Sequence, residues 1–166
     1  MKNYRFDTRS EEEFKKHIKE CTEFEQILMR AYVKWLNDTK GGDQYTFENH
    51  GVDNSGEFIE EDKAVTAQPD FVLLKNGKSP RKIEIKHCKP ARTRFHLKLN
   101  HVKHCIKANV CVVNWMATDT EDPKFCILTP AVLTEALASK TPVKMWNKNC
   151  LRFENKECEW HACRFR

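Results

Sequence analysis

The chain has 166 residues, which suits one domain, and 40% of them are hydrophobic, enough for a packed core, so wholesale disorder is excluded. Its 29 Lys and Arg against 24 Asp and Glu give a net charge of +5, which permits a polyanionic partner without requiring one. No apolar run approaches the roughly 18–20 residues of a membrane span, and charged residues near the start leave no secretory signal. We therefore expect a soluble, cytoplasmic protein with no membrane partner, whose 8 cysteines are not paired in disulfides.

The first part of the chain favours one long helix. Ser10 and Glu13 have the spacing of a capping box, and apolar residues then recur every three or four positions. This pattern predicts a helix from Ser10 to about Asn37. The stretch 38–57 is polar and rich in turn residues, so we expect a loop there, with at most a short strand around 45–47.

Two strands joined by a tight turn follow. Phe71–Leu74 is an apolar run, and Lys82–Lys86 alternates between charged and apolar residues with a period of two. Asn76-Gly77 between them is a strong signal for a two-residue hairpin turn. The sequence therefore predicts a β-hairpin over residues 71–86.

The second half of the chain alternates helices and strands. We expect a helix over Phe95–Ala108, buried strands over Val110–Trp115 and Phe125–Leu128, and a helix from Thr129-Pro130 to about Ser139. The element order predicts a mixed α/β fold in a single domain.

Three ionisable residues at the predicted hairpin are the candidates for a catalytic site. Glu84 and Lys86 share one face of their strand, which we expect to lie outside the core, and folding at the Asn76-Gly77 turn places Asp70 opposite Glu84, give or take a residue. Two carboxylates this close repel each other unless a cation lies between them, and a hard divalent ion such as Mg²⁺ or Mn²⁺ suits oxygen ligands. An adjacent ammonium group can orient or deprotonate a water, or stabilise charge on phosphate, so the group predicts metal-assisted phosphodiester hydrolysis.

These residues resemble the signature of a known family. Pro69-Asp70, a hairpin-length gap and then Glu84-Ile85-Lys86 are similar to the motif of the PD-(D/E)xK nuclease superfamily. The resemblance implies a restriction-endonuclease-like core, with a mixed central β-sheet flanked by helices. It also implies that Asp70, Glu84 and the Ile85 backbone carbonyl hold the metal while Lys86 assists the water.

The resemblance covers roughly residues 10–116 and implies a further acidic residue on the first helix. Glu25 lies in register with the apolar stripe of that helix, where a buried carboxylate needs a partner, so we expect it in the catalytic site; Glu23 lies off the stripe and ranks second. We expect the nuclease core to span 1–142, with a loop- and strand-rich C-terminal extension over 143–166 packed on it.

Basic residues are concentrated between Lys75 and Lys103, which favours a polyanion at the middle of the chain, although a solvated basic face is the alternative. In the family, the helix that follows the Glu–Lys strand often contacts the scissile phosphate or the backbone. The candidates are Arg92, Arg94, His96, Lys98, His101 and Lys103, and we expect nucleic acid to contact Arg92, Arg94, Lys98 and His101.

Four residues of the tail form the pattern C-x7-C-x2-H-x-C: Cys150, Cys158, His161 and Cys163. Cys and His are the ligands of structural Zn²⁺, and such a bound ion could stabilise a loop-rich end of the chain. The spacing does not match a standard paired-cysteine site, so buried or half-buried thiols are the default interpretation.

The resulting hypothesis is a divalent-metal-dependent nuclease, a DNA rather than RNA endonuclease of the small phage, viral or Holliday-junction-resolvase kind. A resolvase would act as a homodimer, which the sequence leaves open. Two alternatives come from other classes: a non-catalytic nucleic-acid-binding module on the same fold, and a zinc-stabilised interaction protein.

Overall fold

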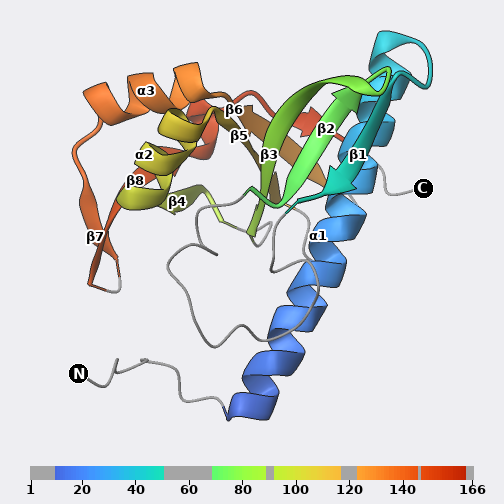
Figure 1. Cartoon of the computed structure of the whole chain (residues 1–166). Coiled ribbons are helices and arrows are strands. Elements are labelled where there is room, and N and C mark those ends of the chain that lie inside the picture. The colour runs from blue at the N-terminus through green and yellow to red at the C-terminus, as the bar shows by residue number, and fades with distance from the viewer. Residues whose placement is uncertain (1–9, 51–68, 89–91, 117–122, 146, 164–166) are drawn as a thin grey trace.

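A computed structural model describes residues 10–50, 69–88, 92–116, 123–145 and 147–163. Within these residues the chain forms three α-helices and two β-sheets (Figure 1). The helices are α1 (Glu11–Lys40), α2 (Leu99–Ala108) and α3 (Pro130–Ser139). None of them is long and apolar enough to cross a membrane.

The larger sheet has six strands and mixed direction. In spatial order they are β1 (Tyr45–Asn49), β2 (Phe71–Lys75), β3 (Lys78–Cys88), β5 (Val110–Met116), β6 (Lys124–Leu128) and β9 (His161–Ala162). β1, β2 and β3 are antiparallel neighbours, whereas β3 and β5 run parallel. A parallel pair needs a crossover connection, and α2 lies within it. The predicted mixed α/β architecture, with a mixed central sheet, is confirmed.

The smaller sheet joins the middle of the chain to its C-terminal part. Its strands are β4 (Arg94–Lys98), β8 (Lys148–Glu154) and β7 (Val143–Met145), all antiparallel, and a short 3-10 helix, η3 (Asn155–Glu157), follows β8. The tail therefore supplies two strands to this sheet and β9 to the edge of the larger one.

α1 begins as the sequence predicts and extends slightly further. The backbone N–H of Ser10 donates to Glu13 at 2.7 Å and the N–H of Glu13 donates to the Ser10 hydroxyl at 3.2 Å, so both halves of the capping box are present. The helix ends at Gly41, whose φ of 75° suits glycine. Only its second half is buried, and Figure 1 shows the first half extending beyond the sheet.

The β2–β3 hairpin confirms the predicted turn. Asn76 and Gly77 both have positive φ, 52° and 68°, as a type I′ turn requires. The register pairs Phe71 with Ile83. This register fixes which side chains of β2 and β3 face each other at the open end of the hairpin.

The prediction of a helix over Phe95–Ala108 is wrong in its first part. Arg94–Lys98 is strand β4, and α2 begins only at Leu99. Phe95 and Leu97 are buried on one side of β4 and pack in the same core as the β8 residues Leu151 and Phe153. This period of two is the signal of a strand, but the partner strand lies more than 50 residues further along the chain.

Both faces of the larger sheet are covered by packed layers. α1 packs on the face that includes Ile85 and Trp115, while α2, α3 and the smaller sheet share a second core that includes Val112. Figure 1 shows α1 on one side of the sheet and α2 and α3 on the other. Side chains on either face of the central strands are therefore buried, which decides the surroundings of Glu84.

Candidate active site

Asp70 and Glu84 face each other where β2 and β3 separate. Asp70 immediately precedes β2, and continuing the Phe71–Ile83 register by one residue places it opposite Glu84, as expected. The Ile85 backbone N–H donates to Asp70 Oδ2 at 3.0 Å, which fixes the carboxylate against β3. The predicted pairing of the two carboxylates is therefore present in the register of the hairpin.

Glu84 is buried, which differs from the expectation that its strand face lies outside the core. The residue is 8% exposed, because the layer containing α2 covers this face of the sheet. Lys86 Nζ donates to Glu84 Oε1 at 2.6 Å, and His101 Nε2 lies 3.6 Å from the same oxygen. A buried carboxylate needs such partners, since an unpaired one is costly to desolvate.

Neighbouring charges and burial shift the pKa values of Asp70 and Lys86. Burial and the negative charge of Glu84 raise the pKa of Asp70 to about 8, against the opposing attraction of Lys86. Burial alone lowers the pKa of Lys86, but the charges of Glu84 and Asp70 outweigh it, so this pKa lies above its ordinary value. Asp70 and Glu84 share the single ammonium group of Lys86, so the negative charge around Asp70 is not fully balanced. At neutral pH Asp70 therefore favours its protonated form.

Glu25 of α1 contributes to the same site. This half-buried residue adds to the negative charge that raises the pKa of Asp70, and it also helps to raise the pKa of Lys86. Glu23, the second choice of the sequence analysis, is exposed. The register of the apolar stripe thus selects the acidic residue whose charge acts on Asp70 and Lys86.

His101 is the site residue whose position the sequence did not predict. It was expected to contact nucleic acid, but its Nε2 lies against Glu84 and 3.5 Å from the Sγ atom of Cys105. Burial and the nearby Lys86 ammonium lower the pKa of His101, so at neutral pH it is uncharged. Only the packing of α2 against β3 reveals this contact.

Asp70 and Glu84 form a donor set that suits a divalent cation. Across the described residues, no group of three His, Cys, Asp or Glu side chains is arranged as a complete metal site. The oxygen pair is nevertheless the type of ligand that Mg²⁺ takes, and the raised pKa of Asp70 reflects missing positive charge. Ile85 touches the site through its N–H, and its carbonyl as a further ligand stays a prediction.

Three of the predicted nucleic-acid-binding residues lie on or next to β4 of the smaller sheet. Arg92 and Arg94 are exposed at the start of β4, and Lys98, also exposed, is the last residue of β4 and the N-cap of α2. The smaller sheet also brings Lys148 of β8 close enough to Lys98 to perturb its ionisation. Lys148 was missed because it is 50 positions away and no local motif marks it.

The tail residues proposed as zinc ligands do not come together. Cys150 is buried in β8, and Cys158 packs against the core shared by α2 and α3. The Cys163 thiol instead donates to the Ala31 carbonyl of α1 at 3.4 Å, and the His161 ring lies against Trp35. Cys163 and Cys158 belong to different cores, and among the described residues no three such side chains are grouped as metal ligands, so these contacts are structural.

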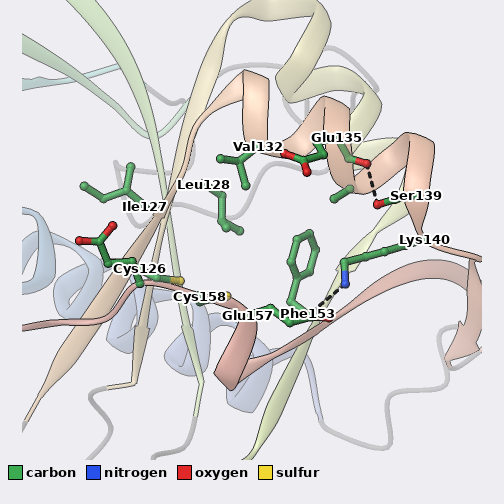
Figure 2. Close-up of a pocket in the computed structure, with 12 residues that line it drawn as sticks. Cys126, Ile127, Leu128, Val132, Glu135, Ser139, Lys140, Phe153, Glu157 and Cys158 are labelled. Atoms are coloured by element: carbon green, nitrogen blue, oxygen red, sulfur yellow. Dashed lines mark hydrogen bonds and ion pairs between the residues drawn. The ribbon is translucent and has the colours of Figure 1, made fainter.

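A cavity of about 420 Å³ lies between β6, α3 and η3, away from the carboxylates (Figure 2). Leu128, Val132 and Phe153 give it apolar walls, and at its edge Lys140 Nζ donates to Glu157 Oε2 at 2.7 Å. A hydrogen bond with Cys158 and burial raise the pKa of Cys126. That thiol is therefore not an activated nucleophile, whereas the same hydrogen bond lowers the pKa of the half-buried Cys158.

Comparison with protein-family models, with curated proteins and with solved structures found no match. Functional inference for this chain therefore rests on its site and not on similarity. The site combines two facing carboxylates, a lysine bonded to one of them and a neighbouring acidic helix residue.

Proposed function

We propose that the protein is a divalent-metal-dependent nuclease that hydrolyses phosphodiester bonds, acting on DNA as an endonuclease. The observation that carries the proposal is the group at the open end of the β2–β3 hairpin. Asp70 faces Glu84 in the strand register, and Lys86 Nζ lies 2.6 Å from Glu84 Oε1. Perturbed ionisable groups gathered in this way are typical of catalytic sites.

The arrangement of the elements supports a restriction-endonuclease-like fold. α1 is followed by the antiparallel strands β1, β2 and β3, and then by α2 and by β5, which is parallel to β3. This is the order of helix, strands, helix and strand that the resemblance to the PD-(D/E)xK superfamily implies. In this chain β4 stands between β3 and α2 as an addition, paired with the C-terminal strands.

Asp70 and Glu84 would hold the metal, and Glu25 adds negative charge around them. When bound, a divalent ion supplies Lewis-acid polarisation of phosphate and lowers the pKa of a bound water. The Ile85 N–H keeps Asp70 oriented by bonding one of its oxygens. His101, uncharged beside Glu84, limits the space around that carboxylate and positions it.

Lys86 acts as a hydrogen-bond donor and a cation in this site. Its raised pKa keeps the ammonium protonated at neutral pH, and its side chain is 40% exposed while that of Glu84 is 10% exposed. The ammonium is therefore anchored at the carboxylates yet open to a substrate from outside. It can orient a water and stabilise the negative charge that develops on phosphate.

The test is a cleavage assay with purified protein and a panel of substrates. Circular and linear DNA, single and double strands, a four-way junction and RNA are each incubated with Mg²⁺, Mn²⁺ or EDTA. We expect DNA cleavage with Mn²⁺ or Mg²⁺, none with EDTA, and none from Glu84→Gln. Cleavage of circular DNA separates endonuclease from exonuclease action. Binding without cleavage in every ion would contradict the proposal and favour a non-catalytic nucleic-acid-binding module.

A further inference from the structure

A second cavity, of about 640 Å³, lies between α2 and the start of β8. Its size falls within the range of roughly 300–1,000 Å³ that small-molecule sites occupy. Its lining consists of two lysines, three asparagines and two histidines: Lys98, Asn100, His101, His104, Asn147, Lys148 and Asn149. None of these residues is acidic. The cavity thus offers hydrogen-bond donors and positive charge, which is the chemistry that receives an anion.

The two lysines are held close together although they repel each other. Burial, the charge of Lys148 and a hydrogen bond with it lower the pKa of Lys98, and Lys86 adds to this effect. β4 and β8 enforce this proximity, because the register pairs Lys98 with Cys150, two residues from Lys148. Crowded ammonium groups destabilise the free protein and are stabilised when an anion lies between them.

Two further features of the cavity are unsatisfied in the free protein. α2 begins here without a side-chain cap and without an acidic residue in its first turn, so the positive end of the helix is not compensated. His104 Nε2 is buried and, within the described part of the chain, has no hydrogen-bond partner. Both features favour a ligand that carries negative charge and acceptor oxygens.

The cavity adjoins the carboxylate site. His101 belongs to its lining, and the Nε2 atom of the same residue lies 3.6 Å from Glu84 Oε1. A strand of nucleic acid placed with one phosphate over Lys86 would therefore bring a neighbouring phosphate to the cavity. A polyanion of linked phosphates can engage both places at once, whereas a single small anion fills only one.

We infer that this cavity is a phosphate-binding subsite of the nuclease: Lys98 and Lys148, with the asparagine side chains around them, hold a backbone phosphate next to the bond that is cut. The inference rests on the proposed function and extends it, because it gives the C-terminal strands a part in substrate binding. The cationic surface continues from the cavity along the smaller sheet, where Arg152 of β8 lies opposite His96 of β4. Arg152 is also paired with Glu154 at 3.2 Å, so it contributes less charge than the two lysines.

The test measures DNA affinity without metal, so that cleavage does not interfere. A fluorescent single-stranded oligonucleotide and its duplex are titrated in EDTA at several salt concentrations, with RNA of the same sequence as a third probe. The variants are Lys98→Gln, Lys148→Gln and the double variant. Lys156→Gln removes the same charge from η3, outside the cavity, and is the matched control.

We expect the double variant to bind about tenfold more weakly at low salt, while Lys156→Gln binds like the wild type. The dependence of log affinity on log salt should flatten by roughly 0.7 per lost contact for a single strand and 0.9 for a duplex. The double variant should melt no lower than the wild type, because it relieves repulsion between two cations.

The outcomes separate this inference from the proposed function. Wild-type affinity of the double variant would overturn the subsite, whether or not the protein cuts DNA. Loss of affinity in the double variant of a protein that cleaves in no ion would support the subsite and overturn the nuclease. Failure of the wild type to bind any of the three probes would overturn the subsite as well.

Discussion

The carboxylate site and the polar cavity are neighbours with opposite physical character. Glu84 is buried and bonded to Lys86 within 2.6 Å, and Asp70 is fixed by a backbone N–H. Lys98 and Lys148, by contrast, are exposed side chains that repel each other. In the first region opposite charges hold one another in place, and in the second like charges are gathered and left uncompensated.

Because of this difference, we expect substitutions in the two regions to change different quantities: the rate of cleavage in the first region and the affinity for DNA in the second. Fixed, buried groups cost nothing to reorganise when a transition state forms, so their removal acts mainly on rate. Exposed cations release counterions when phosphate binds, so their removal acts mainly on affinity and its salt dependence. Substitutions in the two regions should therefore have distinguishable effects.

Replacement of Lys86 should have the largest effect. Lys86→Ala removes the only ammonium hydrogen-bonded to Glu84 within the described residues, and we expect cleavage to fall by about 10²–10⁴-fold. DNA affinity in EDTA should stay near the wild-type value, because the basic face supplies it. Lys86→Arg should not restore activity, since a guanidinium is larger and planar and does not reproduce the compact contact of the ammonium with Glu84. Single-turnover cleavage and anisotropy titrations measure the two effects, with circular dichroism as the folding control.

Divalent metal should stabilise the fold through the two carboxylates. Binding to the native state alone adds about 2.7 kcal/mol at 100 times Kd, which is roughly 5–10 °C in Tm for a chain of this size. Thermal melts with millimolar Mn²⁺ and with EDTA measure this shift. Asp70→Asn should lose most of it, whereas Lys156→Gln should keep it. An unchanged wild-type Tm in Mn²⁺ would contradict metal binding by Asp70 and Glu84.

The raised pKa of Asp70 predicts a pH-dependent stability without metal. The folded-state pKa of about 8 exceeds the ordinary value, so this residue favours folding most at acidic pH, and the contribution is lost as the pH rises through 8. Asp70→Asn, which can still accept the Ile85 N–H, should therefore melt above the wild type in EDTA. The difference should widen from pH 5 to pH 9. A difference in Tm that stays constant or reverses with pH would show that burial and the charge of Glu84 do not raise the pKa of Asp70.

Removal of the outer arginines should have the smallest effect. Arg94→Gln at the start of β4 should weaken DNA binding by about two- to fivefold. The slope of log affinity against log salt should flatten by the amount expected for about one lost phosphate contact. The rate at which bound substrate is cleaved should not change. Titrations at two salt concentrations and single-turnover rates at saturating enzyme measure this. A change in rate instead of affinity would remove the distinction between the two regions.

Local sequence predicted the hairpin and its site well. The Asn76-Gly77 turn joins the strands with Lys75 opposite Lys78, and a one-residue shift of register between Leu73 and Lys75 brings Asp70 opposite Glu84, within the margin of one residue that the sequence allowed. The period of two in the same strand puts Glu84 and Lys86 together, and the helical period of α1 selects Glu25 over Glu23. Apart from that shift, these relations span a few residues or one tight turn, so sequence spacing determines them.

Pairings between distant segments could not be predicted in this way. β4 is a strand because β8 pairs with it from the C-terminal part, and Lys98 meets Lys148 through the same pairing. Glu84 is buried, and His101 contacts it, because α2 packs on that face of the sheet. By itself the sequence determined the turn, the capped helix and the shared strand face of Glu84 and Lys86, where neighbours in the chain supply the interactions. Only the tertiary structure decided burial, the ionisation of Asp70 and the cationic cavity, because these depend on the desolvation and charge that distant segments impose.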